Sequence, residues 1–560
     1  MDRILHWLKK DQYKHTFFLA WAIIGLIQAC FTQLMDDEAY YWVYSQHLAW
    51  GYFDHPPMIA VLIKAGYSLF HNELGVRLFM VLLNVGTLVL LDRLIPVKNN
   101  KVLYLVLGGM GAMQLGGMLA VPDLPLIFFG TLYFVAYKKF LEAQDWKQTI
   151  FLALSMALMF YSKYHGILLV FFTLISNLSL LKVRRYYIAV VITTILFLPH
   201  LIWQYQHDFP SLQYHLVERN AAHYRISFTL DYLLGQILLF GPLVGWLLLY
   251  YGIRCTLQSA FERALKFSLV GVLVFFMIST FKGRVEANWT VMVFTPLVIL
   301  AHQAITRMNF SIKPLLYTLP VSLLLVLIVR VYMVWDFVPG LKVRPEIHHN
   351  HEWTEAIARK AGDKPVVFYN SYQLPSKYMF YTGKLAYSLN NVFSRRSQYN
   401  YWETEPALWG KEVLVADKSK VWVQATDSMT FRINKHLYFM TVKPYYSYNL
   451  IQFNSPVKKF EATVGQTVQL KLGVSSNYNI PVQLNEEAPA IIAYGFWDNE
   501  GWNELQETDI TLPMVVQKDS VIVPVKVPDN PGLYKMKMSI LVKGLQPTHN
   551  SQTMVFEVRP

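Results

Sequence analysis

The first 335 residues are dominated by apolar windows that recur at one length, and this recurrence limits the fold more than any other feature of the sequence. Most windows hold about 17–22 mostly apolar residues, which is the length a helix needs to cross a hydrocarbon core of roughly 30 Å, and several are shorter. The hydrophobic share of 54% and the mean hydropathy of +0.28 are high for a soluble protein and follow from these windows. The sequence therefore predicts a polytopic α-helical membrane protein.

We expect eleven membrane-spanning helices, at 16–34, 75–94, 102–119, 124–141, 149–163, 165–181, 187–204, 231–252, 266–281, 288–304 and 315–335. Basic residues gather on alternate connections between these windows, as Lys138 and Lys139 or Arg184 and Arg185 do. Lys and Arg are retained on the cytoplasmic side of a membrane. The N-terminus is therefore expected in the cytoplasm, and the region after Trp335 outside it.

The formal net charge of +13 raises the question of nucleic acid as a partner. Basic residues between membrane spans have a simpler cause in their cytoplasmic retention, so we expect membrane lipid as a partner and no nucleic acid. The two cysteines, Cys30 and Cys255, both fall within the first 335 residues. Any exported region must therefore fold without disulfides.

Residues 1–335 are expected to form the membrane domain, followed by two exported domains. The first, 336–454, is predicted to be a small α/β unit, with helices at 352–361 and 376–381 and strands at 365–369 and 385–389. From residue 455 onward, short alternating strands are separated by Pro, Gly and Asn turns. This spacing predicts a β-sandwich over 455–560, similar to an immunoglobulin-type accessory domain.

The connection between the first two windows, 35–74, holds two clusters of titratable residues. Asp37 and Glu38 directly follow the first window, at a membrane edge where ionisable groups indicate function. Asp54 and His55 precede two prolines, which hold that cluster in an extended or turn conformation. The alternative for the first cluster is a helix end, since acids in a first turn suit the helix dipole. Two clusters in one connection favour a functional site.

The polar residues of the expected outward connections belong to one membrane face. They are Asp37, Glu38, Asp54, His55, Asp123, Lys163, His165, His215, Glu218, Arg219, Lys282, Arg284 and Glu286. Carboxylates with Lys and Arg at a membrane surface suit a lipid-linked phosphate, because cations hold the phosphate while a carboxylate accepts a proton. A single member such as Lys163 can also be an ordinary polar turn residue. Asp123, flanked by prolines, can be either a helix N-cap or a site residue.

Several motifs resemble one known group of enzymes. The runs Asp37-Glu38-Ala39-Tyr40-Tyr41-Trp42, Gly51-Tyr52-Phe53-Asp54-His55-Pro56-Pro57, Leu74-Gly75-Val76-Arg77-Leu78, Pro122-Asp123 and Glu286-Ala287-Asn288-Trp289 carry the resemblance. They are similar to the bacterial branch of the protein-mannosyltransferase and aminoarabinose-transferase group (family 39). That group belongs to the C-type (GT-C) glycosyltransferases, multi-span enzymes that use polyprenyl-phosphate sugars. The resemblance covers roughly residues 15–335.

The resemblance implies roles for individual residues. Asp37 matches the catalytic base, with Glu38 beside it, and Asp123 matches the second acid of the site. Asp54 stands where some relatives help to bind a divalent metal, and no other cofactor is implied.

The resemblance is weakest at the donor phosphate. His55 stands where aminoarabinose transferases carry a Lys that meets this phosphate, and Tyr40 where they carry an Arg. Neutral His and Tyr offer hydrogen bonds but no fixed charge. We therefore expect Lys282 and Arg284 to supply the missing charge at the donor phosphate.

The expected function is inverting transfer of a sugar from a polyprenyl-phosphate carrier to a hydroxyl or phosphate of an envelope acceptor. Lipid A, another glycan and a protein all remain candidate acceptors, on the outer face of a bacterial cytoplasmic membrane. The main alternative is a lipid-linked sugar flippase or transporter. Transporters place ionisable groups near mid-membrane on repeated, broken helices, whereas here these groups gather at one face. A third alternative is a scaffold whose β-domain binds a glycan or a protein.

Overall fold

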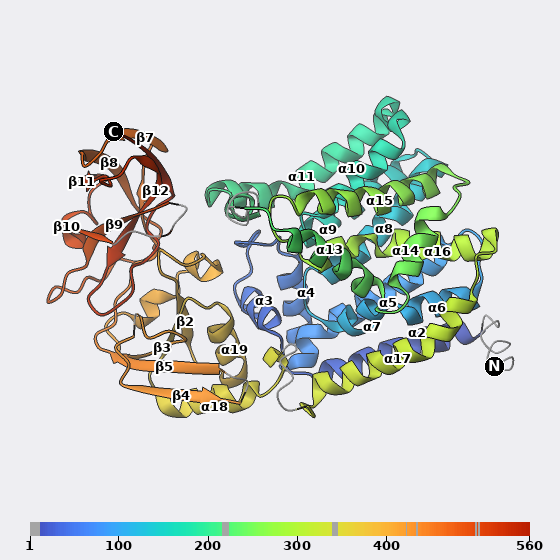
Figure 1. Cartoon of the computed structure of the whole chain (residues 1–560), viewed down its shortest axis with the longest axis horizontal. Helices are drawn as coiled ribbons and strands as arrows, with labels where there is room; N and C mark the ends of the chain where they lie inside the picture. Colours follow the sequence, from blue (N-terminus) through green and yellow to red (C-terminus); the bar gives the residue numbers. More distant parts are fainter. Residues whose placement is uncertain are drawn as a thin grey trace. The chain divides into compact units, whose positions relative to one another are not determined.

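The computed structural model describes residues 12–215, 223–338, 345–421, 423–432, 435–498, 501 and 505–560. The chain divides into two compact units, Met1–His348 and His349–Pro560. The described part of the first unit is helical, and every strand of the described residues belongs to the second (Figure 1). A helical membrane-type unit followed by a β-rich region agrees with the predicted fold class.

All eleven predicted windows coincide with helical segments. The helices of the first unit are α2 (Gln12–Phe31), α3 (Asp36–Gln46), α4 (Met58–Tyr67), α5 (Glu73–Leu94), α6 (Asn100–Gly109), α7 (Gly111–Leu115), η1 (Gly116–Met118), α8 (Asp123–Glu142), α9 (Trp146–Ser162), α10 (Gly166–Ser176), η2 (Leu178–Lys182), α11 (Arg184–Gln206), α12 (Pro210–Gln213), α13 (Ile226–Phe240), α14 (Gly245–Arg254), α15 (Ala260–Ser279), η4 (Ala287–Val293), α16 (Phe294–Met308) and α17 (Lys313–Val334).

The number of helices able to cross a membrane is smaller than the number of windows. Six helical segments of the described residues are long and apolar enough, or seven if α13 and α14, which bend by 91°, count as one broken span. The window 102–119 divides at Met110 into α6, α7 and η1. Between α13 and α14, Gly241 has φ +135°, and a Cβ there would lie 2.4 Å from the carbonyl oxygen of Gly109. The count of eleven spans therefore stays a prediction.

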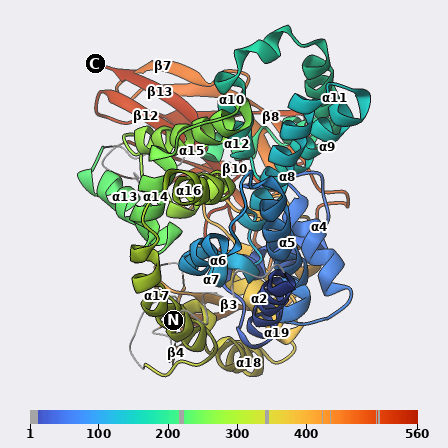
Figure 2. The same ribbon diagram turned by 90° about the vertical axis from the view of Figure 1, so that its right-hand side faces the viewer.

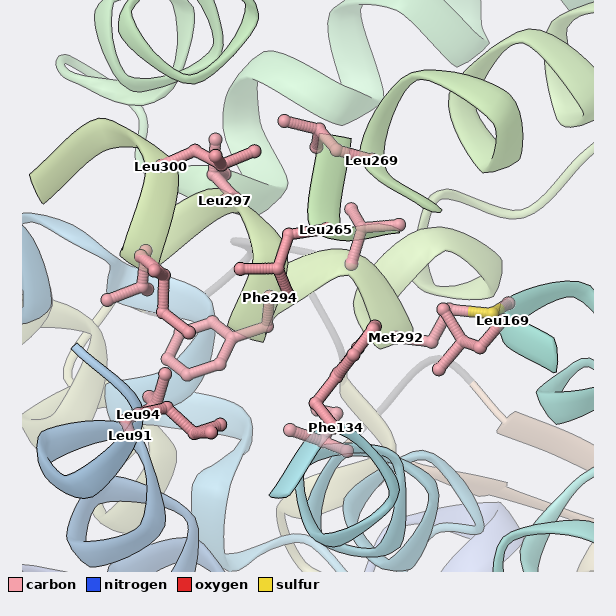
Figure 3. Packing of buried hydrophobic residues seen from close by; sticks show 14 of the residues in the cluster. Leu91, Leu94, Phe134, Leu169, Leu265, Leu269, Met292, Phe294, Leu297 and Leu300 are labelled. Atoms are coloured by element: carbon pink, nitrogen blue, oxygen red, sulfur yellow. The ribbon is translucent and has the colours of Figure 1, made fainter. Parts of the chain in front are cut away.

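The core of the first unit joins helical segments that are far apart in the sequence. Figure 3 shows Leu91 and Leu94 of α5, Phe134 of α8, Leu169 of α10, Leu265 and Leu269 of α15, Met292 of η4, and Phe294, Leu297 and Leu300 of α16, all fully or almost fully buried. In contrast, only 22% of the most apolar window of α11 or of α17 is buried inside the protein. Apolar helix surface left uncovered in this way suits contact with lipid.

The connection 35–74, predicted as a loop, contains two short helices, α3 and α4. α3 begins at Asp36, so that Asp36, Asp37 and Glu38 occupy its first turn. Carboxylates in a first turn stabilise the positive end of the helix dipole. α3 packs on α4. α4 packs on α5, and α5 in turn lies beside α2 (Figure 2).

The second unit begins with the predicted α/β region. The first unit ends with η5 (Pro345–Ile347), and the elements of the α/β region are α18 (Asn350–Ala361), β1 (Val366–Tyr369), α19 (Gln373–Thr382), β2 (Ala386–Leu389), η6 (Gln398–Asn400), η7 (Glu405–Leu408), β3 (Val413–Asp417), β4 (Asp427–Phe431) and β5 (Lys435–Val442). The strand order is β2-β1-β3-β5-β4, parallel from β2 to β3 and antiparallel beyond. Trp353 and Ile357 of α18 and Tyr378 of α19 are buried in its core.

The rest of the second unit forms two packed sheets. Its elements are β6 (Ile451–Asn454), β7 (Lys459–Thr463), β8 (Thr467–Ser476), β9 (Ile491–Trp497), β10 (Gln506–Thr511), η8 (Leu512–Met514), β11 (Ser520–Lys526), β12 (Gly532–Leu541) and β13 (Met554–Arg559). The sheet orders are β10-β9-β12-β13-β7 and β11-β8-β6. The short strands predicted after residue 455 are present. Buried Glu405 accepts a hydrogen bond from Tyr478 of this part, so the α/β region and the β-rich region share polar contacts.

The predicted orientation can be tested by reporter fusions. A fusion after Lys147 is expected to report a cytoplasmic position, and a fusion after Pro345 an exported one, because basic residues mark the cytoplasmic connections. Alkaline phosphatase and green fluorescent protein activities of the two fusions provide the measurement. An exported signal after Lys147 would reverse the orientation.

Candidate functional site

Buried tyrosine side chains stabilise the turn between α3 and α4. The Tyr44 hydroxyl donates to Asp54 Oδ1 at 2.7 Å, and both residues are buried. The Tyr44 ring stacks on Tyr52 with ring centroids 4.1 Å apart. The Tyr52 amide donates to the His55 carbonyl oxygen at 3.1 Å. These contacts hold Asp54 and His55 on a rigid turn.

The same turn is held from outside by α11 and the segment after it. His200 Nδ1 donates to the Trp50 carbonyl oxygen at 2.7 Å. The Ser211 hydroxyl lies within hydrogen-bond distance of the Phe53 carbonyl oxygen (2.9 Å). His215 Nε2 donates to the Asp54 carbonyl oxygen at 3.2 Å. Three polar side chains more than a hundred residues away therefore bind the backbone of this turn.

Glu38 forms a buried ion pair with Arg77 of α5. Arg77 Nε donates to Glu38 Oε1 at 2.7 Å and Nη2 to Oε2 at 2.5 Å, and both side chains are fully buried. The Glu38 carboxylate also accepts from the backbone amides of Met35 (3.0 Å) and Ala120 (2.8 Å). Arg77 further donates to carbonyl oxygens at the end of α2, among them Ala29. This pair joins α2, α3, α5 and the turn before α8.

Asp123 is the centre of a second buried polar group. Lys163 Nζ lies 2.7 Å from Asp123 Oδ1, and both side chains are almost fully buried. Asn288 Nδ2 donates to Asp123 Oδ2 at 3.1 Å. Asp123 begins α8, Lys163 follows α9, and Asn288 belongs to η4. The structure thus brings the Pro-Asp and Glu-Ala-Asn-Trp motifs together.

His55 lies between these groups. Burial lowers its pKa to about 4, and Asp54, Lys163, His215 and Asp123 are close enough to affect that pKa electrostatically. Its ring also contacts Tyr41, with centroids 5.5 Å apart. At neutral pH the imidazole is therefore uncharged. It can exchange hydrogen bonds with a phosphate but supplies no positive charge.

The lowered pKa of His55 predicts a pH dependence of stability. The folded protein resists protonation at His55 while the unfolded chain does not, so the free energy of unfolding falls as the pH drops from about 6.5 toward about 4. His55→Asn, which cannot titrate, is expected to show a shallower loss. Thermal unfolding in detergent across this pH interval measures it. His71→Asn, the same change at an exposed histidine of the same connection, is the control, and identical pH profiles for the His55 variant and the parent would contradict this prediction.

The other predicted site residues occupy different surroundings. Asp37 is exposed in the first turn of α3. Tyr40 is buried against Tyr44, with ring centroids 4.7 Å apart. Lys282 and Arg284 are exposed in the turn after α15, and Arg284 Nε lies 3.7 Å from Glu286. Glu218 and Arg219 lie outside the described residues.

The described residues do not form a metal site. Among them, no group of three or more His, Cys, Asp or Glu side chains is arranged to hold a metal ion. The Asp54 carboxylate instead accepts a hydrogen bond from the Tyr44 hydroxyl. The divalent metal that the resemblance implies at Asp54 stays a prediction.

Sequence reasoning missed the partners of the two acids. For Lys163, an ordinary polar turn was an open alternative to a site role. Arg77 and Asn288 were named only as members of their motifs. A charged residue inside an apolar window, as Arg77 is, was the available signal. No local pattern pairs Asp123 with Lys163, because the pairing depends on how α8 and α9 pack.

The chain matches known proteins in sequence and in fold. A family model described as dolichyl-phosphate-mannose-protein mannosyltransferase matches residues 54–203. The lipid A galacturonosyltransferase RgtD of Rhizobium johnstonii is 24% identical over 304 residues, and the match spans 51% of this chain and 63% of RgtD. The chain therefore aligns with less than two thirds of that relative.

Solved structures agree with the sequence matches. ArnT from Cupriavidus metallidurans in the apo state superposes with a TM-score of 0.56 at 16% identity, covering 76% of this chain and 98% of ArnT. Its complex with undecaprenyl phosphate gives a TM-score of 0.55 at 14% identity, covering 77% and 98%. At such identities the likeness concerns the fold. Together with the family model and RgtD, it confirms the predicted resemblance: the chain is similar to the ArnT-like group of GT-C membrane glycosyltransferases.

Proposed function

We propose that this protein transfers a sugar from a polyprenyl-phosphate carrier to an envelope acceptor. The observation that carries this proposal is the meeting of Asp54 and His55 with the Asp123–Lys163–Asn288 group at the end of the helical unit where α3 begins. Such a site offers carboxylates for proton transfer and donors for phosphate oxygens. An ArnT-like fold supports the same activity.

The chemistry requires a base more than an activated donor. A polyprenyl phosphate leaves readily once positive groups offset its growing charge. The acceptor hydroxyl must lose its proton as the bond forms, and a positioned carboxylate contributes about 10²–10⁴-fold. We assign this base to Asp37, which is exposed to an incoming acceptor. Direct displacement then inverts the anomeric carbon without a covalent enzyme intermediate.

The remaining site residues receive supporting roles. Asp123, held by Lys163 and Asn288, orients a substrate from a fixed position. Neutral His55 donates a hydrogen bond to the donor phosphate, and Tyr40 supports that region through Tyr44. Lys282 and Arg284, being exposed, provide charge for the same phosphate. Glu38 is a positioning residue, because its carboxylate is already occupied by Arg77 and two backbone amides.

The relatives indicate which substrates to test first. RgtD is named for lipid A, and one ArnT structure contains undecaprenyl phosphate. We therefore propose an undecaprenyl-phosphate sugar as donor and lipid A as first acceptor, with other glycans and proteins as alternatives. The reaction is assigned to the outer face of the cytoplasmic membrane, because the site lies at the end expected to face outward.

A reconstitution experiment separates this proposal from a flippase. Purified protein in vesicles is given radiolabelled undecaprenyl-phosphate sugar and lipid A. Transfer predicts a new glycosidic bond, seen as labelled lipid A and free undecaprenyl phosphate. Redistribution of the donor between leaflets, with no labelled product for any of lipid A, other glycan or protein acceptors, would instead establish the flippase.

A further inference from the structure

α17 carries an arginine, Arg330, within an otherwise apolar helix. The residues that precede Arg330 in α17 are mostly apolar, and Arg330 lies one turn before the end of the helix at Val334. α17 packs along α2 (Figure 1). A guanidinium stays protonated under all physiological conditions. A positive charge on a helix that crosses the membrane is costly unless an anion or hydrogen-bond acceptors compensate it.

The described neighbours of Arg330 supply acceptors but no negative charge. Arg330 Nη1 donates to Gln28 Oε1 at 3.4 Å, and Nη2 donates to the Gln114 carbonyl oxygen. Gln28 Nε2 returns a hydrogen bond to the Arg330 carbonyl oxygen at 3.2 Å. Among the described residues, no Asp or Glu lies within ion-pair distance of this guanidinium. Within the described part of the chain, two of its five N–H groups donate hydrogen bonds, both to neutral partners.

Two buried cationic groups at this end of the helical unit have a different environment. Arg77 is paired with Glu38, and Lys163 with Asp123, in both cases inside the protein. Arg330 is instead partly exposed, on a helix whose apolar window is mostly uncovered. It is thus open to the surrounding lipid from the side.

A continuous set of contacts links Arg330 to the candidate site. Gln28 Nε2 donates to Thr32 Oγ1 at 2.8 Å, and the Thr32 carbonyl oxygen accepts from Arg77, the partner of Glu38. Met333, one turn along α17, packs in a cluster with Ala29 and against Met35, the residue before α3. The arginine therefore lies at the same end of the helices as Asp37.

We propose that Arg330, oriented by Gln28 and Gln114, binds the phosphate of a lipid that enters between α2 and α17. The chemistry is a charge-assisted hydrogen bond from the planar fork of an arginine to phosphate oxygens. The lipid can be a polyprenyl phosphate or a phospholipid, because both present such oxygens at the membrane surface. The site is independent of whether Asp37 is the base, so it is tested by binding.

Arg330→Gln tests the proposal directly. It removes the charge and keeps a hydrogen-bonding side chain, so affinity for undecaprenyl phosphate is expected to fall at least ~10-fold. Undecaprenol, which lacks the phosphate, should bind equally to parent and variant. Arg254→Gln, the same change at an exposed arginine at the end of α14, is the matched control and should leave affinity unchanged. Binding is measured in detergent together with thermal unfolding.

A second variant keeps the test valid if Arg330→Gln does not fold. Gln28→Glu places a carboxylate beside Arg330, which then pairs inside the protein, so phosphate affinity should fall while the arginine remains. Parallel titration with phosphatidylglycerol distinguishes the lipids. A loss for undecaprenyl phosphate alone supports a site for the carrier, and a loss for both supports a general lipid-phosphate site. Unchanged affinity for both lipids in folded variants overturns the proposal.

Discussion

Asp37→Asn is expected to lower turnover by about 10²–10⁴-fold while binding of the polyprenyl-phosphate sugar persists. Asn keeps the size and much of the hydrogen bonding of Asp but cannot accept the acceptor proton. Because Asp37 is exposed in the first turn of α3, its replacement should disturb little of the packing. The measurements are sugar transfer to lipid A and donor affinity, both with purified enzyme in detergent.

The neighbouring acid provides a matched control for this prediction. Asp36→Asn removes the same charge from the same helix turn, so it reproduces any effect on the helix dipole, which is worth about 0.3–1 kcal/mol. Its turnover should remain close to that of the parent. Arg284→Ala should instead weaken donor binding, because its proposed partner is the phosphate. Near-normal turnover of Asp37→Asn would remove the assigned base.

Arg77→Met is expected to cause the largest loss of stability, about 3–5 kcal/mol, because it leaves the buried Glu38 carboxylate without its counter-charge. The carbonyl oxygen of Ala29 at the end of α2 would also lose its donor. Equilibrium unfolding in mixed micelles measures the change. α3 should be released first, since Glu38 ties its first turn to α5.

A double variant identifies the origin of this loss. Glu38→Gln combined with Arg77→Met removes both charges and should be more stable than Arg77→Met alone, since breaking a buried pair costs more than removing it. Arg254→Met, at an exposed arginine, should change stability little. If the double variant is no more stable than Arg77→Met, the stranded charge is not the cause.

The sequence by itself determined the class of the fold and the position of the main acids. Apolar windows and alternating strands are local patterns, and each reflects a burial requirement that a segment carries in any context. The helical segments, the α/β region, the short strands after residue 455 and the family resemblance were therefore predictable. The Asp37 and Asp54 motifs were recognisable because their residue types follow one another directly in the chain.

Only the tertiary structure decided which residues meet. Lys163 reaches Asp123 across 40 residues, Asn288 across 165, and Arg330 reaches Gln28 across 302. Such pairs depend on which helix faces pack together, and hydropathy averages over all faces of a helix. The breaks at Met110 and Gly241 likewise arise from close approach between segments distant in sequence. Local periodicity places a residue in a helix, whereas packing alone determines its partner and hence its charge environment.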